Sequence, residues 1–467
     1  MTSLCILLLL ALSGAMAMAA SPSIVKFLPG FDGELPFKLE TGYIGVGEID
    51  EVQLFYYFVE SQGDPSNDPL ILWLTGGPGC SGFSALVYEI GPLLFKVQSW
   101  KPGTLPSLRA SKNSWTKVAN IIFIDQPVGT GFSYGTTAAA YNSSDTVAAA
   151  QVYKFLRKWL MYHPKFGANP LYVGGDLYSG ITVPLLVQTI LDGIGSGSLP
   201  RMQLKGYLLG NPLTDDFIDA NSKIPYAFRV NLLSDQLYED AELNCNGDFV
   251  NVDFNNTNCV AVLQGIKENL QLINEAQILE PVCALAKPKG EGIQWGAEEA
   301  EFTDSLILQD IIPELTCRSS SWMLSYIYMN DEGVQMALGV KEGTMNSTWR
   351  RCAKSLPFYE EDVSSTVAYH KNFTRTALRA LIYSGDQALS IPYLGTLEWI
   401  NSLGVPIFDT WRPWFVDGQV AGYTQKYEKN SYSLTFATVK GAGETAPEYK
   451  RKEALAMVNR WFAGYPV

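Results

Sequence analysis

Residues 173–180, with the sequence VGGDLYSG, have the glycine-rich pattern of a turn that holds a catalytic side chain in some enzymes. The pattern predicts the end of a buried strand, a sharp turn and the start of a helix, which is the geometry of a nucleophile elbow. Its glycines suit the close approach of strand and helix. The residue at the tip is Leu177. A leucine has no nucleophilic atom, so nothing at this position can form a covalent ester.

Other residues could take over parts of such chemistry. Ser179 lies two residues into the expected helix, about 200° around from Leu177, and should face the packing. The chain has only two histidines. His163 is expected to cap the end of a helix. His370 precedes a strand, whereas sites in open α/β sheets form at the carboxyl ends of strands. A general base must come within about 3 Å of its nucleophile, and neither histidine is expected to do so.

The elements that must position these residues alternate between strands and helices. Continuous apolar runs that stop at glycine-rich turns predict strands buried on both faces, and an alternating pair of segments predicts an opening antiparallel hairpin. We therefore expect an α/β fold with a mostly parallel central sheet and helices on both faces. The expected strands are 42–46 and 53–59 for the hairpin, then 70–74, 120–125, 171–174, 206–210, 380–384 and 434–439; the expected helices include 144–162 and 446–462.

The chain divides into four parts by composition. Residues 1–20 are uncharged, contain a short apolar run and end in small residues, which predicts a secretory signal peptide; a membrane anchor is the alternative. Residues 21–210 and 346–467 hold the strand and helix pattern and predict the two parts of a core. The more polar region 211–345 predicts an inserted cap domain, with an exposed, charged linker near 286–304.

Charge and cysteine content point to the secretory pathway. A net charge of −13 argues against nucleic acid and anionic membranes as partners, and no span is expected after signal cleavage. Loss of Cys5 with the signal leaves six cysteines, an even number that predicts disulfides in an oxidising compartment, either the vacuole or the cell exterior. Four sequons predict N-glycosylation at Asn142, Asn255, Asn346 and Asn372.

Five motifs occur in the order and spacing of the serine carboxypeptidase family, which the mature chain resembles over essentially its whole length. They are WLTGGPGCS (73–81), DQPVGTGFSY (125–134), GDLYSG (175–180), IYSGD (382–386) and KGAG (440–443). The resemblance implies an α/β-hydrolase fold that needs no cofactor and no metal. The finer similarity is to the plant acyltransferase branch, because Thr75 and Asp176 stand where peptidases usually have Asn and Glu. With Gly76, these two residues are implied to bind substrate, and the changes weaken a clamp for a peptide carboxylate.

The resemblance also assigns roles to individual positions. A family member uses a Ser nucleophile, a His base and an orienting Asp; here the three positions hold Leu177, Glu444 and Asp386, so two of them are degenerate. The backbone N–H groups of Gly77 and Tyr178 are implied to form an intact oxyanion hole. The implied disulfides are Cys80–Cys352, Cys245–Cys259 and Cys283–Cys317, although six cysteines allow 15 pairings on sequence alone.

These features leave three hypotheses for function. The first is a non-catalytic companion of an active acyltransferase paralogue that uses 1-O-acyl glucose esters. The second is an active acyltransferase or carboxypeptidase with unconventional residues, such as Ser179 as nucleophile or Glu444 paired with Asp386 in a dyad of carboxyl groups. The third is a protein that binds an acyl sugar or a phenolic compound in the retained pocket.

Overall fold

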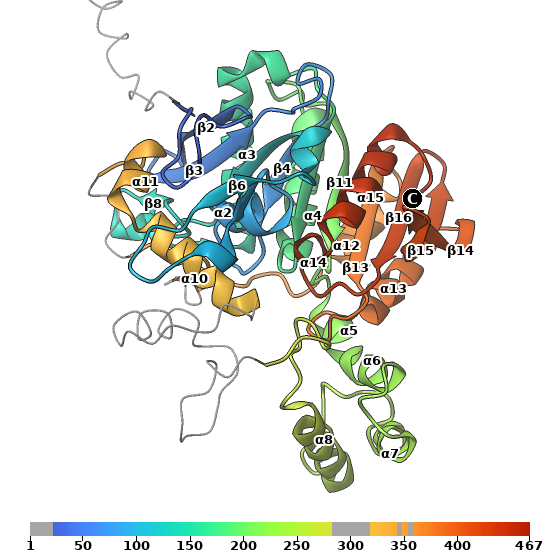
Figure 1. Cartoon of the computed structure of the whole chain (residues 1–467). Coiled ribbons are helices and arrows are strands. Elements are labelled where there is room, and N and C mark those ends of the chain that lie inside the picture. Colours follow the sequence, from blue (N-terminus) through green and yellow to red (C-terminus); the bar gives the residue numbers. More distant parts are fainter. Residues whose placement is uncertain (1–21, 283–317, 343–347, 354–355, 357) are drawn as a thin grey trace, which may run out of the picture.

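The computed structural model describes residues 22–282, 318–342, 348–353, 356 and 358–467 (Figure 1). Within this part of the chain, a 12-stranded sheet has the order β1-β2-β3-β7-β4-β10-β11-β13-β16-β15-β14, and β8 pairs with β3. The strands are β1 Ser23–Val25, β2 Leu39–Val46, β3 Val52–Val59, β4 Leu70–Leu74, β7 Asn120–Ile124, β8 Tyr134–Gly135, β10 Leu171–Asp176, β11 Leu204–Gly210, β13 Arg379–Gly385, β14 Ile407–Val416, β15 Gln419–Lys429 and β16 Tyr432–Val439.

The centre of the sheet is parallel and its two ends are antiparallel. Strands β7, β4, β10, β11, β13 and β16 run parallel, while β2 pairs antiparallel with β3, and β15 with β14 and β16. β4 and β10 are buried along their whole length, as strands covered on both faces must be. The predicted hairpin and the predicted parallel strands are confirmed; β14 and β15 were not predicted.

Helices cover both faces of the sheet, as predicted. One face packs against α3 (Asp145–Tyr162), α4 (Ser179–Gly195), α12 (Val367–Phe373) and α13 (Tyr393–Ser402). Ser144 caps α3 by accepting a hydrogen bond from the backbone N–H of Val147, which fixes the start of that helix. The other face packs against the π-helical turn η1 (Ala85–Glu89), α10 (Arg318–Met329), α11 (Glu332–Ala337) and α15 (Arg451–Ala463).

Short elements complete the core. They are α2 (Gly82–Ser84), α14 (Ala446–Tyr449), the strand pairs β5–β6 (Leu93–Phe95, Leu108–Ala110) and β9–β12 (Ser143–Ser144, Tyr359–Glu360), and the 3-10 turns η2 (Val97–Ser99), η3 (Trp115–Lys117), η4 (Ala138–Tyr141) and η5 (Pro164–Phe166). In the described part of the chain, none of the helices is both long and apolar enough to cross a bilayer.

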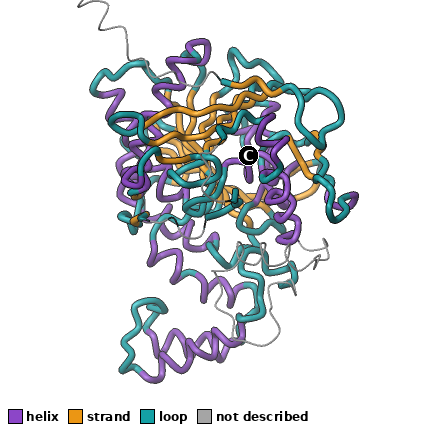
Figure 2. The backbone as a smooth tube through the Cα atoms, turned by 90° about the vertical axis from the view of Figure 1, so that its left-hand side faces the viewer, coloured by secondary structure: helices purple, strands orange, loops and turns teal. Residues whose placement is uncertain are grey.

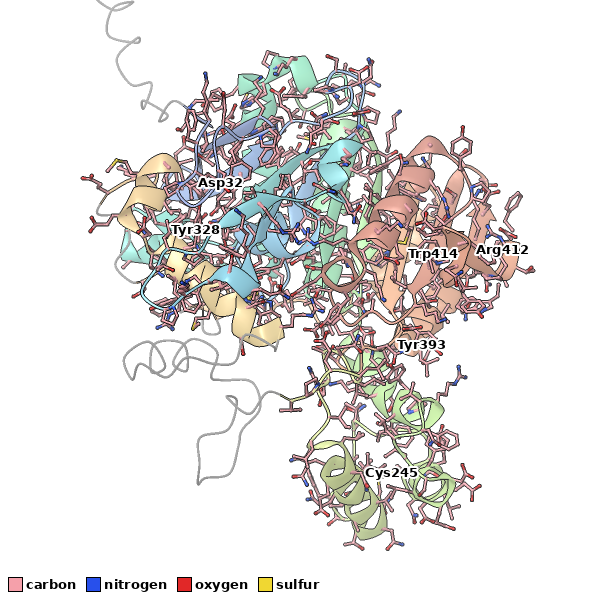
Figure 3. All side chains as sticks on the ribbon, in the orientation of Figure 1. Asp32, Cys245, Tyr328, Tyr393, Arg412 and Trp414 are labelled. Atoms are coloured by element: carbon pink, nitrogen blue, oxygen red, sulfur yellow. A yellow bond between two sulfur atoms is a disulfide. The ribbon has the colours of Figure 1, made fainter. Side chains whose placement is uncertain are left out.

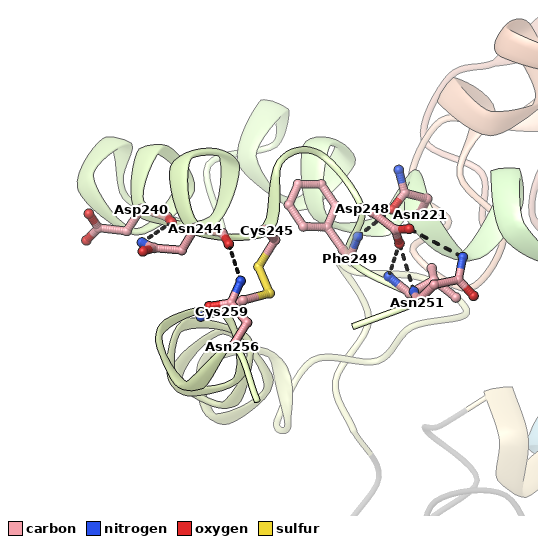
Figure 4. The surroundings of a disulfide bond; sticks show 10 residues. Asn221, Asp240, Asn244, Cys245, Asp248, Phe249, Asn251, Asn256 and Cys259 are labelled. Carbon is pink, nitrogen blue, oxygen red and sulfur yellow. Dashed lines mark hydrogen bonds between the residues drawn. A yellow bond between two sulfur atoms is a disulfide. The ribbon is translucent and has the colours of Figure 1, made fainter. Parts of the chain in front are cut away.

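An arm of four helices projects from the core between β11 and β13 (Figures 1 and 2). It comprises α5 (Asp216–Asn221), α6 (Lys223–Arg229), α7 (Asp235–Cys245) and α8 (Thr257–Leu270). Helices α6, α7 and α8 pack around a small apolar cluster that also includes Leu389 of the core. A disulfide between Cys245 and Cys259 joins α7 to α8 (Figure 4). Helices α10 and α11 also fall inside the predicted cap range 211–345, yet they pack on the core through residues such as Leu324 and Tyr328.

The second disulfide joins Cys80 to Cys352, so two of the three implied pairs are confirmed. Cys283 and Cys317 lie outside the described residues, as do the predicted linker near 286–304 and the predicted signal peptide. Asn142, Asn255 and Asn372 are exposed, which glycosylation requires, while Asn346 lies outside the described residues.

Candidate active site

The elbow keeps its backbone geometry without its nucleophile. β10 ends at Asp176, α4 begins at Ser179, and Leu177 between them has a φ of +51°. Few residues other than glycine adopt this left-handed conformation, which costs an L-residue roughly 1–2 kcal/mol. The backbone of Leu177 is anchored in both directions, because its N–H donates to Gly210 O (3.0 Å) and its carbonyl accepts from Leu213 N (2.9 Å). The predicted strained turn is therefore present.

The loop after β4 lies directly against this turn. A Cβ on Gly76 would come within 2.7 Å of both Asp176 O and Leu177 Cβ, and within 3.1 Å of Tyr178 N. Only glycine fits such an approach. The backbone N–H groups of Gly77 and Tyr178 donate no hydrogen bond to another described residue. Two neighbouring free amides are what an oxyanion hole requires, and they are independent of the side chain at position 177.

The carboxyl groups at the two remaining triad positions, Asp386 and Glu444, accept hydrogen bonds from different donors. Asp386 follows β13, and its Oδ1 accepts from Gly441 N (2.7 Å) and from Gln387 Nε2 (2.9 Å). Burial raises the pKa of Asp386. Glu444 Oε2 accepts from Ser390 Oγ at 2.6 Å. The carboxylate at the base position is thus engaged with a loop serine, and a carboxylate cannot play the part of a neutral imidazole beside an orienting aspartate.

A pocket of about 610 Å³ opens above the elbow. Gly77, Leu177 and Glu444 are among the residues that line it. Thr75 and Asp176 are buried beneath it, with 6% and 1% of their surfaces exposed. The pocket is lined by Gly77, Pro78, Cys80, Ser84, Tyr88, Glu89, Leu177, Trp322, Arg351, Cys352, Ala353, Leu356, Tyr359, Glu361, Glu444, Thr445 and Glu448.

The arrangement agrees with comparisons to known proteins. The family model described as serine carboxypeptidase matches residues 29–464. This chain belongs to the serine carboxypeptidase family. It is 45% identical to serine carboxypeptidase-like 7 and 46% identical to serine carboxypeptidase-like 2 of Arabidopsis thaliana, each over 96% of this chain and 94% of the relative. The crystal structure of the Saccharomyces cerevisiae carboxypeptidase KEX1(delta)p has the same fold, with a TM-score of 0.72 over 94% of this chain and 95% of that chain at 18% identity.

The histidines and Ser179 of this serine carboxypeptidase homologue are used structurally. Ser179 is buried, and its Oγ donates to Leu74 O at 2.9 Å. His163 ends α3, stacks on Trp159 and contacts Glu40 Oε1 through Nε2 at 2.8 Å. His370 is fully buried with Nδ1 2.9 Å from the hydroxyl of Tyr207, and burial lowers its pKa to about 3. All three lie outside the lining of the pocket.

The sequence reasoning missed Glu89, which comes from η1 and lines the pocket floor. Burial, and next the charge of Asp176, raise the pKa of Glu89 well above its usual range. Burial also raises the pKa of Asp176 to about 6, although Asp176 Oδ1 accepts from Gly76 N at 3.1 Å. The charge of one buried carboxylate therefore favours the protonated form of the other. A lone glutamate inside the apolar run from Phe83 to Ile90 was the signal that could have identified it.

The sequence reasoning also missed another part of the pocket lining, which comes from Trp322 of α10 and from residues 351–353. The guanidinium of Arg351 lies 3.9 Å from the centre of the Trp322 ring, and Trp322 Nε1 donates to Glu448 Oε1 at 3.1 Å. Next to the Cys80–Cys352 disulfide, Ser81 N donates to Arg351 O (2.8 Å). The disulfide therefore holds residues 351 and 352 against the loop after β4, which carries Gly77.

The described residues contain no group of three or more His, Cys, Asp or Glu side chains arranged to hold a metal ion. The site offers the backbone N–H groups of Gly77 and Tyr178, the buried carboxyl groups of Glu89 and Asp176, and the Trp322 ring. A nucleophile and a base are the two parts that it lacks at their expected positions.

Proposed function

We propose that this chain is a non-catalytic serine carboxypeptidase-like protein that assists an active paralogue of the acyltransferase branch. The paralogue would transfer acyl groups from 1-O-acyl glucose esters in plant secondary metabolism, and this chain would support its folding, transport or activity in the secretory pathway, in the vacuole or outside the cell. The observation that carries the proposal is the leucine at the tip of an otherwise complete elbow, at φ +51°.

Further observations support this proposal over an enzyme with unconventional residues. Ser179 donates its hydroxyl proton to Leu74 O and is buried, so it has neither a base nor access to a substrate. Glu444 accepts from Ser390 rather than from a nucleophile at the elbow. The Cys80–Cys352 and Cys245–Cys259 disulfides fit a protein of the secretory pathway.

The proposal is tested in two steps. The secreted, deglycosylated chain is first treated with a fluorophosphonate and its intact mass is measured; we expect no adduct. The chain is then co-expressed with a paralogue that has serine at the elbow, and the yield and rate of that paralogue are compared with co-expression of an unrelated secreted glycoprotein. An unchanged yield and rate would contradict the companion function, and an adduct would contradict the loss of catalysis.

A second function, binding of an acyl sugar or a phenolic compound, is favoured by the pocket itself. Its volume of about 610 Å³ lies in the range of small-molecule sites, and Ser84 Oγ on its wall is buried without a hydrogen-bond partner. Titration calorimetry with such ligands should give binding heat that Ala353→Trp, which fills the pocket, abolishes. Ile49→Trp, on the exposed surface, is the matched control. Heat that survives Ala353→Trp would place the ligand elsewhere.

A further inference from the structure

The last strand of the sheet, β14, exposes large apolar side chains at the edge of the sheet. Ile407, Phe408, Trp411 and Phe415 on β14 and Tyr423 on β15 are each between 41% and 66% exposed; we call these five residues the β14 edge. Trp411 stacks on Tyr423 with a centroid distance of 5.8 Å and an angle of 4° between the rings. In the described part of the chain, β14 has a neighbouring strand on one side only. Large apolar side chains gathered on one exposed surface mark a contact with another molecule.

An ion pair lies in the middle of this apolar strand. Arg412 Nε is 2.8 Å from Asp409 Oδ2, and the two side chains are 34% and 38% exposed. Figure 3 shows Arg412 at this outer margin of the sheet. Apolar residues precede Asp409 and follow Arg412 along the strand. Both charges are therefore partly exposed within an apolar surface. Arg412 Nη1 also donates to Val467 O at 2.9 Å.

The order of these residues is self-complementary. If two β14 strands align antiparallel about a two-fold axis between Thr410 and Trp411, Asp409 of each copy faces Arg412 of the other, and Phe408 faces Pro413. Opposite charges and apolar pairs that face each other stabilise such an alignment, and an isologous contact of this kind closes as a dimer. We propose that the β14 edge is a two-fold interface between two copies of this chain.

A short backbone ladder beside the axis would set this register, and side chains would form the rest of the contact. Pro413 has no N–H to donate. The pairing of β14 with β15 also shifts register between Ile407 and Asp409, between Asp409 and Arg412, and between Trp414 and Phe415. Such irregularities prevent open-ended strand addition, so the interface favours one dimer over a growing sheet. The proposal is independent of the companion function, because it concerns contacts between identical chains.

The test is a charge exchange followed by sedimentation velocity on the full secreted chain. The native chain should sediment as a concentration-dependent dimer. Asp409→Arg places like charges across the axis and should weaken dimerisation tenfold or more, whereas Asp409→Arg combined with Arg412→Asp should restore it to within about threefold. Asp32→Arg is the matched control, because it reverses an exposed ion pair with Lys96 on a distant part of the surface (Figure 3). It should leave the dimer unchanged.

A cross-link gives a second measurement that does not alter the ion pair. Thr410 is exposed beside the proposed axis, so Thr410→Cys should form a disulfide-linked dimer under mild oxidation, while Lys429→Cys at the end of β15 should not. A chain that stays monomeric up to about 100 μM would overturn the proposal. So would a dimer that Asp409→Arg leaves intact, or association with a paralogue alone.

Discussion

Rebuilding the two missing catalytic residues tests the reasoning on the site most directly. Leu177→Ser places a hydroxyl on a backbone that already has the elbow conformation, at φ +51°. The oxyanion donors Gly77 and Tyr178 need no change, because they are backbone groups. Leu177→Ser alone still lacks a base, since position 444 holds a carboxylate that accepts from Ser390. Adding Glu444→His supplies an imidazole next to the retained Asp386.

The expected increase in labelling rate follows from the contribution of the added general base. A positioned general base accelerates nucleophilic attack by ~10²–10⁴-fold, which corresponds to about 3–5 kcal/mol of transition-state stabilisation. We therefore expect Leu177→Ser/Glu444→His to react with a fluorophosphonate ~10²–10⁴ times faster than Leu177→Ser. Adding Asp386→Asn should return the rate close to that of Leu177→Ser, because the imidazole loses the acceptor that orients it.

The assay is the rate of fluorophosphonate labelling, followed by intact mass, with mapping of the modified serine and circular dichroism to show that each variant is folded. Labelling should occur at position 177 alone. A folded Leu177→Ser/Glu444→His variant that reacts no faster than Leu177→Ser would refute the inference that the oxyanion hole and Asp386 remain in catalytic positions.

Two further predictions concern stability. The raised pKa of Asp176, about 6 instead of 3.8, means that the unfolded chain loses its proton first, so this group destabilises the fold increasingly as the pH rises from about 4 to about 6. Asp176→Asn should therefore gain in melting temperature relative to the native chain over that range, and a relative loss would contradict the assignment. Replacing Cys245 and Cys259 by serine opens a disulfide with a sequence separation of 14, worth about 3 kcal/mol. Hydrogen exchange should become about 100-fold faster in α7 and α8 but stay unchanged in β4 and β10, and equal acceleration of the core would show that the arm is not an independent unit.

The centre of the fold could be predicted because its signals are local. The segments 70–74, 120–124 and 171–174 are apolar runs that stop at glycine-rich turns, and each is a strand in the structure. The close approach of Gly76 to Leu177 Cβ, in contrast, joins segments far apart in the sequence and was not predicted from either glycine motif.

The features that were not predicted depend on contacts between distant segments or on irregular strands. The apolar run around Glu89 could have indicated a buried carboxyl group, but no spacing in the sequence indicates that Glu89 and Asp176 meet. β14 exposes aromatic residues and contains Pro413, so it lacks the alternation that identifies a strand. The engagement of Glu444 by Ser390 was equally hidden, because the serine reaches it from the loop after β13.

The Cys80–Cys352 bond has a topological consequence for the whole molecule. It closes a covalent ring across a sequence separation of 272 residues, and this ring contains the elbow and the complete arm. A single break of the backbone inside the ring would leave one connected molecule, visible as two fragments only after reduction. The two parts of the core would thus stay joined through a cut in the segments between them.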